Sequence, residues 1–182
     1  MTRYTILLRG INVGGKNKVS MAALKETLQG LGYTNVSTYI ASGNVLLESA
    51  ESPERIKAQI EAALIENFEL DDEVIKVLVL SRGQLQAVIE NKPEHFGDRP
   101  NEYHSDAIFL MGVDAADAMS AFSPREGVDE VWPGDGVIYS QRLSAERTKS
   151  RLNRVMASPL YKSMTIRSWS TTVKLWEMTN EL

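Results

Sequence analysis

Residues 36–48 read VSTYIASGNVLLE, and this stretch decides the predicted fold. Its two ends, residues 36–40 and 45–48, are rich in apolar and β-favouring side chains, which is typical of strands. Between them, Ser42-Gly43-Asn44 favours a tight turn, so the stretch predicts a hairpin. A hairpin at this place favours an antiparallel sheet over a doubly wound parallel one.

The elements on either side of the hairpin complete a βαββαβ order. Further strands are predicted at residues 4–8 and 74–80, and helices at about 21–30 and 53–68. Ser20 is a suitable N-cap for the first helix, and Ser52, followed by Pro53 and Glu54, opens the second. This order predicts the ferredoxin-like split unit, in which two helices cover one face of an antiparallel sheet.

The second half of the sequence follows the same rhythm. A short helix is expected over 81–91. After it come a strand at 107–111, a short helix capped by Asp114, and a hairpin with strands at 128–132 and 137–139. Helices are expected over 144–157 and from Arg167 onward. We therefore predict an α+β protein of two ferredoxin-like units, the second a truncated duplicate, with domains at 1–91 and 105–182.

The composition is typical of a folded, water-soluble protein, with 43% hydrophobic and 24% charged residues. No apolar run approaches the roughly 20 residues that span a bilayer, and no signal sequence is recognised, so we expect a cytoplasmic location and no membrane partner. The absence of cysteine excludes disulfides and thiolate metal sites. Residues 1–47 and 136–182 are basic, whereas residues 48–135 carry seven Lys/Arg against twenty Asp/Glu.

Residues 9–18, RGINVGGKNK, form what we call the glycine loop, between a predicted strand and a predicted helix. Glycines allow positive φ and close backbone approach, and cations attract an anion. The candidate ligand-binding residues here are Arg9, Asn12, Gly14, Gly15, Lys16 and Lys18. Residues 10–17 match the phosphate-binding pattern GxxxxGK[ST] except at Asn17, which replaces the hydroxyl that binds magnesium. The alternative is that the glycines only permit a turn, the lysines are solvated and Asn12 stabilises the turn.

Basic side chains are frequent near the C-terminus. Arg147, Arg151 and Arg154 would share one face of the predicted helix 144–157, and Arg167 is a further candidate ligand-binding residue. The alternative for this stripe is an ordinary solvated helix face. In the closing helix, Trp169, Val173 and Trp176 recur at helical spacing, which favours packing over base stacking. The turn 42–44 is expected to lie away from the glycine loop.

Other chemistry is weakly supported by the residues. His95 and His104 lie in one stretch with three acids, Asp98, Glu102 and Asp106, but nothing fixes a metal geometry. The predicted strand 45–48 has no aromatic residue, which disfavours an RNA-recognition domain. The sequence therefore predicts no cofactor and no metal ligand.

Two long phrases resemble a known family. LLRGINVGGKNKV at residues 7–19 and TYIASGNVLLES at 38–49 are similar to the domain of unknown function 1697 family, which is uncharacterised and mainly bacterial. The ending at 165–171 resembles the TxRNW-type ending of that family, with Ser168 where Asn is usual. The resemblance implies two ferredoxin-like α/β units. It implies no established activity, substrate or cofactor.

Together, these observations predict a protein that binds a phosphorylated or otherwise anionic ligand, a nucleotide or nucleic acid, through the glycine loop. Whether it catalyses a reaction is left open. Two alternatives remain: a metal-dependent phosphoester hydrolase using acids of the middle region, and a protein-interaction module that associates with itself or a partner through oppositely charged faces.

Overall fold

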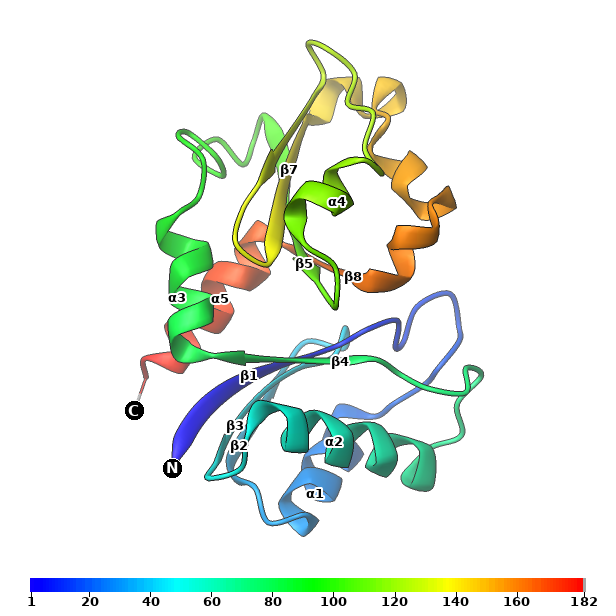
Figure 1. Ribbon diagram of the computed structural model, residues 1–182, viewed down its shortest axis with the longest axis vertical. Coiled ribbons are helices and arrows are strands. Elements are labelled where there is room, and N and C mark those ends of the chain that lie inside the picture. The colour runs from blue at the N-terminus through cyan, green and yellow to red at the C-terminus, as the bar shows by residue number, and fades with distance from the viewer. Residues whose placement is uncertain (182) are drawn as a thin grey trace. The chain divides into compact units, whose positions relative to one another are not determined.

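The computed structural model describes residues 1–181 and divides into two compact units (Figure 1). Unit 1 comprises Met1–Gln86 and the C-terminal residues from Leu175 on, and unit 2 comprises Ala87–Lys174. Each unit has its own four-stranded antiparallel sheet. The α+β fold class with two ferredoxin-like units is therefore confirmed. The domain limits 1–91 and 105–182 stay predictions.

Unit 1 has the predicted element order. Its sheet is arranged β2-β3-β1-β4, and α3 follows the last strand. The bounds are β1 Thr2–Leu8, α1 Met21–Gly30, β2 Thr34–Tyr39, β3 Asn44–Ser49, α2 Pro53–Asn67, β4 Val77–Ser81 and α3 Arg82–Glu90. The Ser20 and Ser52 hydroxyls accept backbone N–H groups of Ala23 and Arg55, so both predicted N-caps are confirmed.

The core of unit 1 lies between the sheet and helices α1 and α2. Alternate residues of β1 point toward these helices because successive side chains of a strand face opposite sides. They meet the apolar stripes of the two helices, which recur at helical spacing. The fully buried members include Ile6, Leu8, Leu28, Ile56 and Ile60.

Unit 2 has a complete sheet, arranged β6-β7-β5-β8, so the predicted truncation was wrong. The bounds are β5 Tyr103–Leu110, α4 Ala115–Met119, β6 Asp129–Pro133, β7 Val137–Leu143 and β8 Met164–Ser168. Helix α5, Trp169–Thr179, begins in unit 2 and ends in unit 1. Strand β8 was missed because Arg167 was taken as the start of the closing helix. In the structure its side chain is buried and the helix begins two residues later.

The predicted helix 144–157 was also wrong. Residues 144–163, which we call the basic connector, form three short 3-10 helices, η1 Ser144–Lys149, η2 Leu152–Ala157 and η3 Pro159–Ser163. Extended backbone at Ser150 and Ser158 separates them. Helix η1 has no buried side chain and η2 has two, Leu152 and Val155, so no continuous helical stripe is available to pack. The shared arginine face of a regular helix does not form.

The two units repeat each other in register. After the first strand, Leu8 N–H donates to Gly43 O at 2.8 Å, and Leu110 N–H donates to Gly136 O at 3.0 Å. The last strands are joined to the first strands by an equivalent pair of bonds, Arg9 N–H to Lys76 O and Met111 N–H to Ser163 O. The serines that end β4 and β8, Ser81 and Ser168, both accept a backbone N–H three residues on. The predicted duplication is thus visible in the hydrogen-bond register.

The repeat has two departures. Between the first strand and first helix, unit 1 has residues 9–20, whereas unit 2 has only residues 111–114. Between the third and fourth strands, unit 1 has α2, whereas unit 2 has the basic connector. Since functional sites are often carried by segments added to a common scaffold, these two segments are the first places to examine.

Candidate functional site

The glycine loop folds into a small hairpin. Asn12 N–H donates to Asn17 O at 3.0 Å, Lys16 N–H donates to Val13 O at 3.1 Å, and Val13 and Lys16 form an antiparallel bridge. Gly14 and Gly15 at the tip have φ of 61° and 74°, the backbone region that a two-residue I′ hairpin turn requires. Helix α1 begins only at Met21, so Lys16 is not at a helix N-terminus as it would be in a nucleotide-binding P-loop.

Asn12 holds the base of this hairpin. Its Nδ2 donates to Val19 O at 2.9 Å and to Ala41 O at 2.7 Å, and its Oδ1 accepts from Val19 N–H at 2.8 Å. All three bonds are internal to unit 1. Asn12 therefore has the turn-stabilising role that the sequence analysis gave as the alternative to contacting a ligand.

Asn17 is the second clamp, and the sequence had assigned it only as a mismatch to the P-loop pattern. Its side chain is buried; Nδ2 donates to Gly10 O and to Asp72 Oδ2, and Oδ1 accepts the N–H groups of Asp71 and Asp72. The Asn17 N–H donates in turn to Asp71 Oδ2 at 2.6 Å. The two aspartates, Asp71 and Asp72, therefore lie against the stem of the glycine loop, where their negative charge would repel an anion. An anion could approach the loop only at its tip.

The hairpin turn between β2 and β3 adjoins the glycine loop, so the expectation that it lies elsewhere was wrong. The reason is the antiparallel pairing of β1 with β3, which brings the end of one strand to the start of the other. Besides the bond from Asn12 to Ala41, a Cβ on Gly43 would lie 2.8 Å from Ile11 Cδ1. Ile40 in this turn has φ of 49°, a costly conformation for a β-branched residue.

The tip of the loop is open and positively charged. Lys16 flanks the tip and Lys18 follows the stem residue Asn17; both are exposed, and neither side chain forms an ion pair with any residue from 1 to 181. Apart from the adjoining residues, no atom lies within 4 Å of where a Cβ on Gly14 or Gly15 would be, and residues 13–16 are all exposed, so the tip has open space around it. Val13, also at the tip, is 64% exposed. Arg9, at the end of the strand, is half-buried.

Arg167, the remaining candidate, belongs to unit 2. It lies in β8, is 6% exposed, and donates from Nη1 to Thr165 Oγ1 and Ile166 O, both at 2.9 Å. Burial lowers its pKa to about 10, still well above neutrality, so the guanidinium stays charged. Its participation in one site with the glycine loop stays a prediction.

The other sequence candidates have separate local partners. His95 lies near Glu94 and Asp98, whereas His104 Nε2 pairs with Asp106 at 3.0 Å, which raises the pKa of His104. Among the described residues no group of three His, Asp or Glu side chains could hold a metal ion. The packing expected for this stripe is confirmed at Trp169, which is buried edge-on against Phe96 and Tyr139. Val173 and Trp176 are only half-buried, and the Arg82 guanidinium lies over the Trp176 ring.

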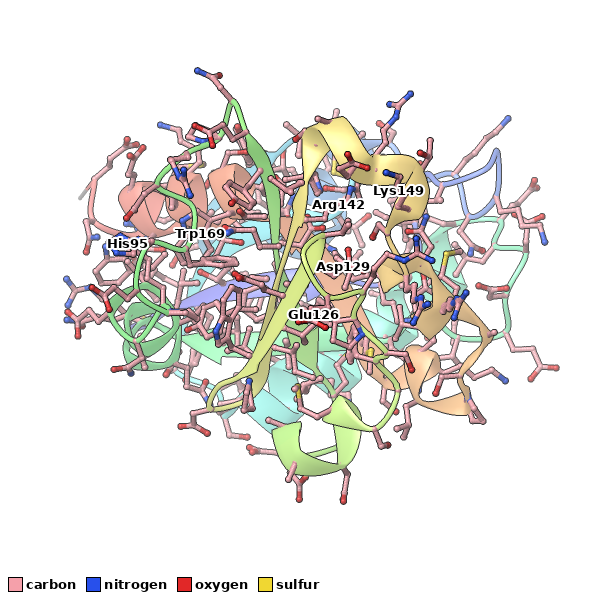
Figure 2. The ribbon with its side chains drawn as sticks, turned by 90° about the horizontal axis from the view of Figure 1, so that it is seen from above. His95, Glu126, Asp129, Arg142, Lys149 and Trp169 are labelled. Carbon is pink, nitrogen blue, oxygen red and sulfur yellow. The ribbon has the colours of Figure 1, made fainter. Side chains whose placement is uncertain are left out.

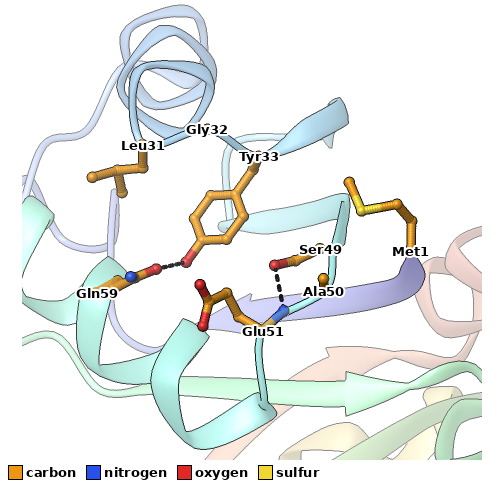
Figure 3. Close-up of a pocket in the computed structure, with 8 residues that line it drawn as sticks. All are labelled: Met1, Leu31, Gly32, Tyr33, Ser49, Ala50, Glu51 and Gln59. Carbon is orange, nitrogen blue, oxygen red and sulfur yellow. Dashed lines mark hydrogen bonds between the residues drawn. The ribbon is translucent and has the colours of Figure 1, made fainter.

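Unit 1 also has a shallow pocket of about 230 Å³, separate from the glycine loop (Figure 3). Its polar groups are already engaged: the Tyr33 hydroxyl donates to Gln59 Oε1, and the Glu51 carboxylate pairs with Arg55 at 2.8 Å. The pocket is lined by Met1, Leu31, Gly32, Tyr33, Ser49, Ala50, Glu51 and Gln59. It offers fewer groups to an anion than the loop does.

The architecture and the loop together define a two-unit ferredoxin-like α+β protein with an added glycine loop in its first unit. A family model described as "Protein of unknown function (DUF1697)" matches residues 1–139, and the chain belongs to this family. The matched range includes the glycine loop and ends within β7, before the closing motif at 165–171.

A solved structure has the same fold: the conserved bacterial protein SP0830 from Streptococcus pneumoniae. It is 27% identical, covers 98% of this chain and 99% of its own, and has a TM-score of 0.79. None of the curated proteins is significantly similar to the chain. Within residues 1–181, every helix is too short or too polar to cross a membrane.

Proposed function

We propose that this protein binds nucleic acid, and that the tip of the glycine loop contacts the phosphate backbone. The observation that carries the proposal is the presentation of Lys16 beside the tip of a clamped hairpin and of Lys18 directly after its stem, both exposed and without an ion pair within residues 1–181. Lysines neutralise phosphates and release counterions, which supplies much of the affinity for a polyanion.

The shape of the loop favours a polymer over a small phosphorylated metabolite. Small-molecule sites are concave and bury most of their ligand, whereas the glycine tip has open space around it. A protruding hairpin can instead lie along a groove or a single strand. The exposed Val13 beside the lysines would face sugars or bases.

The internal clamps support the same proposal. Asn12 and Asn17 fix both sides of the stem, so little loop entropy is lost when the tip binds. Unit 2 has the same scaffold but lacks the glycine loop, so the fold does not require this loop. Such a loop is expected where the added segment serves binding. A cytoplasmic location and the absence of a cofactor stay predictions.

The test is a salt titration of binding with a labelled single-stranded oligonucleotide, followed by fluorescence anisotropy. The Lys16→Ala/Lys18→Ala variant should bind more weakly, and its slope of log K against log[salt] should be smaller by about 1.4, or roughly 0.7 for each lost phosphate contact.

The matched control is Lys25→Ala/Lys57→Ala, which removes two exposed lysines from α1 and α2 of the same unit. This variant has the same net charge as the loop variant and should keep the wild-type slope. Equal loss of oligonucleotide affinity in both variants would mean that the protein attracts the oligonucleotide only through its overall charge. Wild-type affinity in the loop variant would refute the proposal.

A further inference from the structure

Unit 2 contains a cluster of polar groups that lack partners, at the junction of its sheet and the basic connector. Four buried side-chain nitrogen or oxygen atoms within residues 1–181 have no hydrogen-bond partner. Three of them lie here: Arg142 Nε, Arg151 Nε and Asp129 Oδ1. Such atoms are rare in folded proteins because an unpaired buried donor or acceptor is costly, so their concentration calls for an explanation.

The strand register brings these groups together. Arg142 on β7 lies opposite Asp129 on β6 (Figure 2). On its other side, the register places Arg142 opposite His104 on β5. The Asp129 carboxylate is 5% exposed, and its Oδ2 accepts the Arg151 N–H at 2.8 Å and the Arg125 N–H at 2.9 Å. Asp129 thereby fixes the backbone of Arg151, in the connector, beside the strand that presents Arg142.

Asp129 remains ionised in this environment. Burial alone would raise its pKa, but the Arg151 and Arg125 amides, the Ser150 hydroxyl and the charge of Arg142 outweigh burial and hold the pKa below its usual value. The carboxylate thus feels the charge of Arg142 and binds the backbone of Arg151, while the Nε atoms of both arginines stay buried without a hydrogen-bond partner and neither side chain forms an ion pair within residues 1–181. Of the neighbouring charges, Lys149 pairs with Glu146 and His104 pairs with Asp106.

We propose that Arg142 and Arg151 together bind a phosphate-type oxyanion at this junction, in a site independent of the glycine loop. Both residues are half-buried as a whole, and their Nε atoms are buried, so an oxyanion bound by these side chains would be partly screened from water. Each planar guanidinium offers several N–H donors in the fork geometry that matches two oxygens of a phosphate. The acceptor that the protein itself offers here is the Asp129 carboxylate, whose Oδ1 is bonded to neither arginine, and an oxyanion would supply acceptors to both guanidinium groups.

The direct test follows the arginine Nε–H signals of the full chain by nitrogen-15 NMR while inorganic phosphate is added. The signals of Arg142 and Arg151 should shift together and saturate. Parallel titrations with a nucleoside monophosphate and with an oligonucleotide distinguish free or terminal phosphate from the internal phosphodiesters of a polymer. Absence of saturable shifts with all three probes overturns the proposal.

Variants separate this site from general charge effects. Arg142→Met/Arg151→Met keeps much of the apolar stem and should weaken phosphate binding at least tenfold. The control Arg147→Met/Arg154→Met removes two exposed connector arginines and should leave the affinity within about twofold. Arg142→Lys/Arg151→Lys, which keeps the charge but loses the forks, should also bind more weakly and covers the case in which the methionine variant fails to fold.

The glycine-loop variant Lys16→Ala/Lys18→Ala should retain the shifts of Arg142 and Arg151. Failure of the two proposals is therefore distinguishable, because one is read from the salt dependence of oligonucleotide binding and the other from two arginine signals. Equal phosphate affinity in the Arg142→Met/Arg151→Met variant and in wild type would also contradict the proposed site.

Discussion

The two units share one sheet topology but cover it differently. In unit 1 the link between the third and fourth strands is α2, whose stripe of Ile56, Ile60, Ala63 and Leu64 is buried. In unit 2 the equivalent link is the basic connector, which places Val155 in the core around Ile108 and Met164. The sheet therefore does not need a second regular helix; the spacing of apolar residues in the link decides which form it takes.

The consequence for function lies in what the connector presents. A regular helix uses its backbone N–H groups internally, whereas interrupted 3-10 turns leave amides such as that of Arg151 available to a side chain. Unit 1 departs from the repeat at a different place, where the glycine loop is added. Each unit thus combines the common sheet with one basic segment of its own.

The largest expected effect compares the two links directly. Ile60→Ala in α2 removes a fully buried side chain and should lower the free energy of unfolding by about 2–5 kcal/mol. Val155→Ala in the connector should cost roughly 1 kcal/mol less, because about one methylene fewer is lost from the core. Urea denaturation measures both.

Ile65→Ala is the control in the same helix, since Ile65 is 51% exposed and its loss should change stability by less than about 0.5 kcal/mol. A greater loss for Val155→Ala than for Ile60→Ala would contradict the comparison, because the connector would then contribute more packing than α2.

A smaller effect is expected at two equivalent glycines, Gly43 and Gly136, with φ of 90° and 69°. Alanine at either position adopts a left-handed backbone, at a cost of roughly 1–2 kcal/mol. A Cβ at Gly43 would also meet Leu8 Cβ at 2.8 Å, whereas a Cβ at Gly136 would have no atom within 4 Å. Gly43→Ala should therefore destabilise by roughly 1–3 kcal/mol more than Gly136→Ala.

Chemical denaturation of the two alanine variants provides this comparison, with each serving as the other's control. Equal losses would show that the backbone conformation alone matters, and that the close approach of the hairpin turn to the glycine loop adds nothing to stability.

Local signals explain how much of the fold could be predicted. The hairpin at 36–48 and the caps at Ser20 and Ser52 are read from adjacent residues, and all are present. The connector could not be read in this way, because its backbone is fixed by Asp129, a residue 22 positions before Arg151. Strand β8 was missed since a buried arginine in a strand is indistinguishable in sequence from one on a helix surface.

The same limit applies to the candidate site. The positive φ of Gly14 and Gly15 and the exposure of Lys16 and Lys18 follow from local chemistry and were predicted as one of two alternatives. The bonds from Asn17 to Asp71 and Asp72 join residues 54 and 55 positions apart, so no local pattern identifies them. Asn17 has a φ of 48°, a left-handed backbone that asparagine tolerates, and this preference is the local signal that could have indicated a structural role.

The smallest expected effect concerns Tyr139, which occupies in unit 2 the register position of Leu46 in unit 1. Its buried hydroxyl donates to Val88 O at 2.6 Å, and burial raises its pKa to about 12, against about 10 in an unfolded chain. Tyr139→Phe should cost about 0.5–1.5 kcal/mol at neutral pH.

Because the folded-state pKa is raised, the contribution of Tyr139 is complete below pH 10 and is lost as the pH rises toward 12. The wild type should then lose stability more steeply than Tyr139→Phe, by roughly 1.4 kcal/mol per pH unit, in urea titrations across that range. Parallel curves for the two proteins would mean that this hydroxyl ionises as freely in the folded protein as in the unfolded chain, and the difference between the two strand positions would then be one of shape alone.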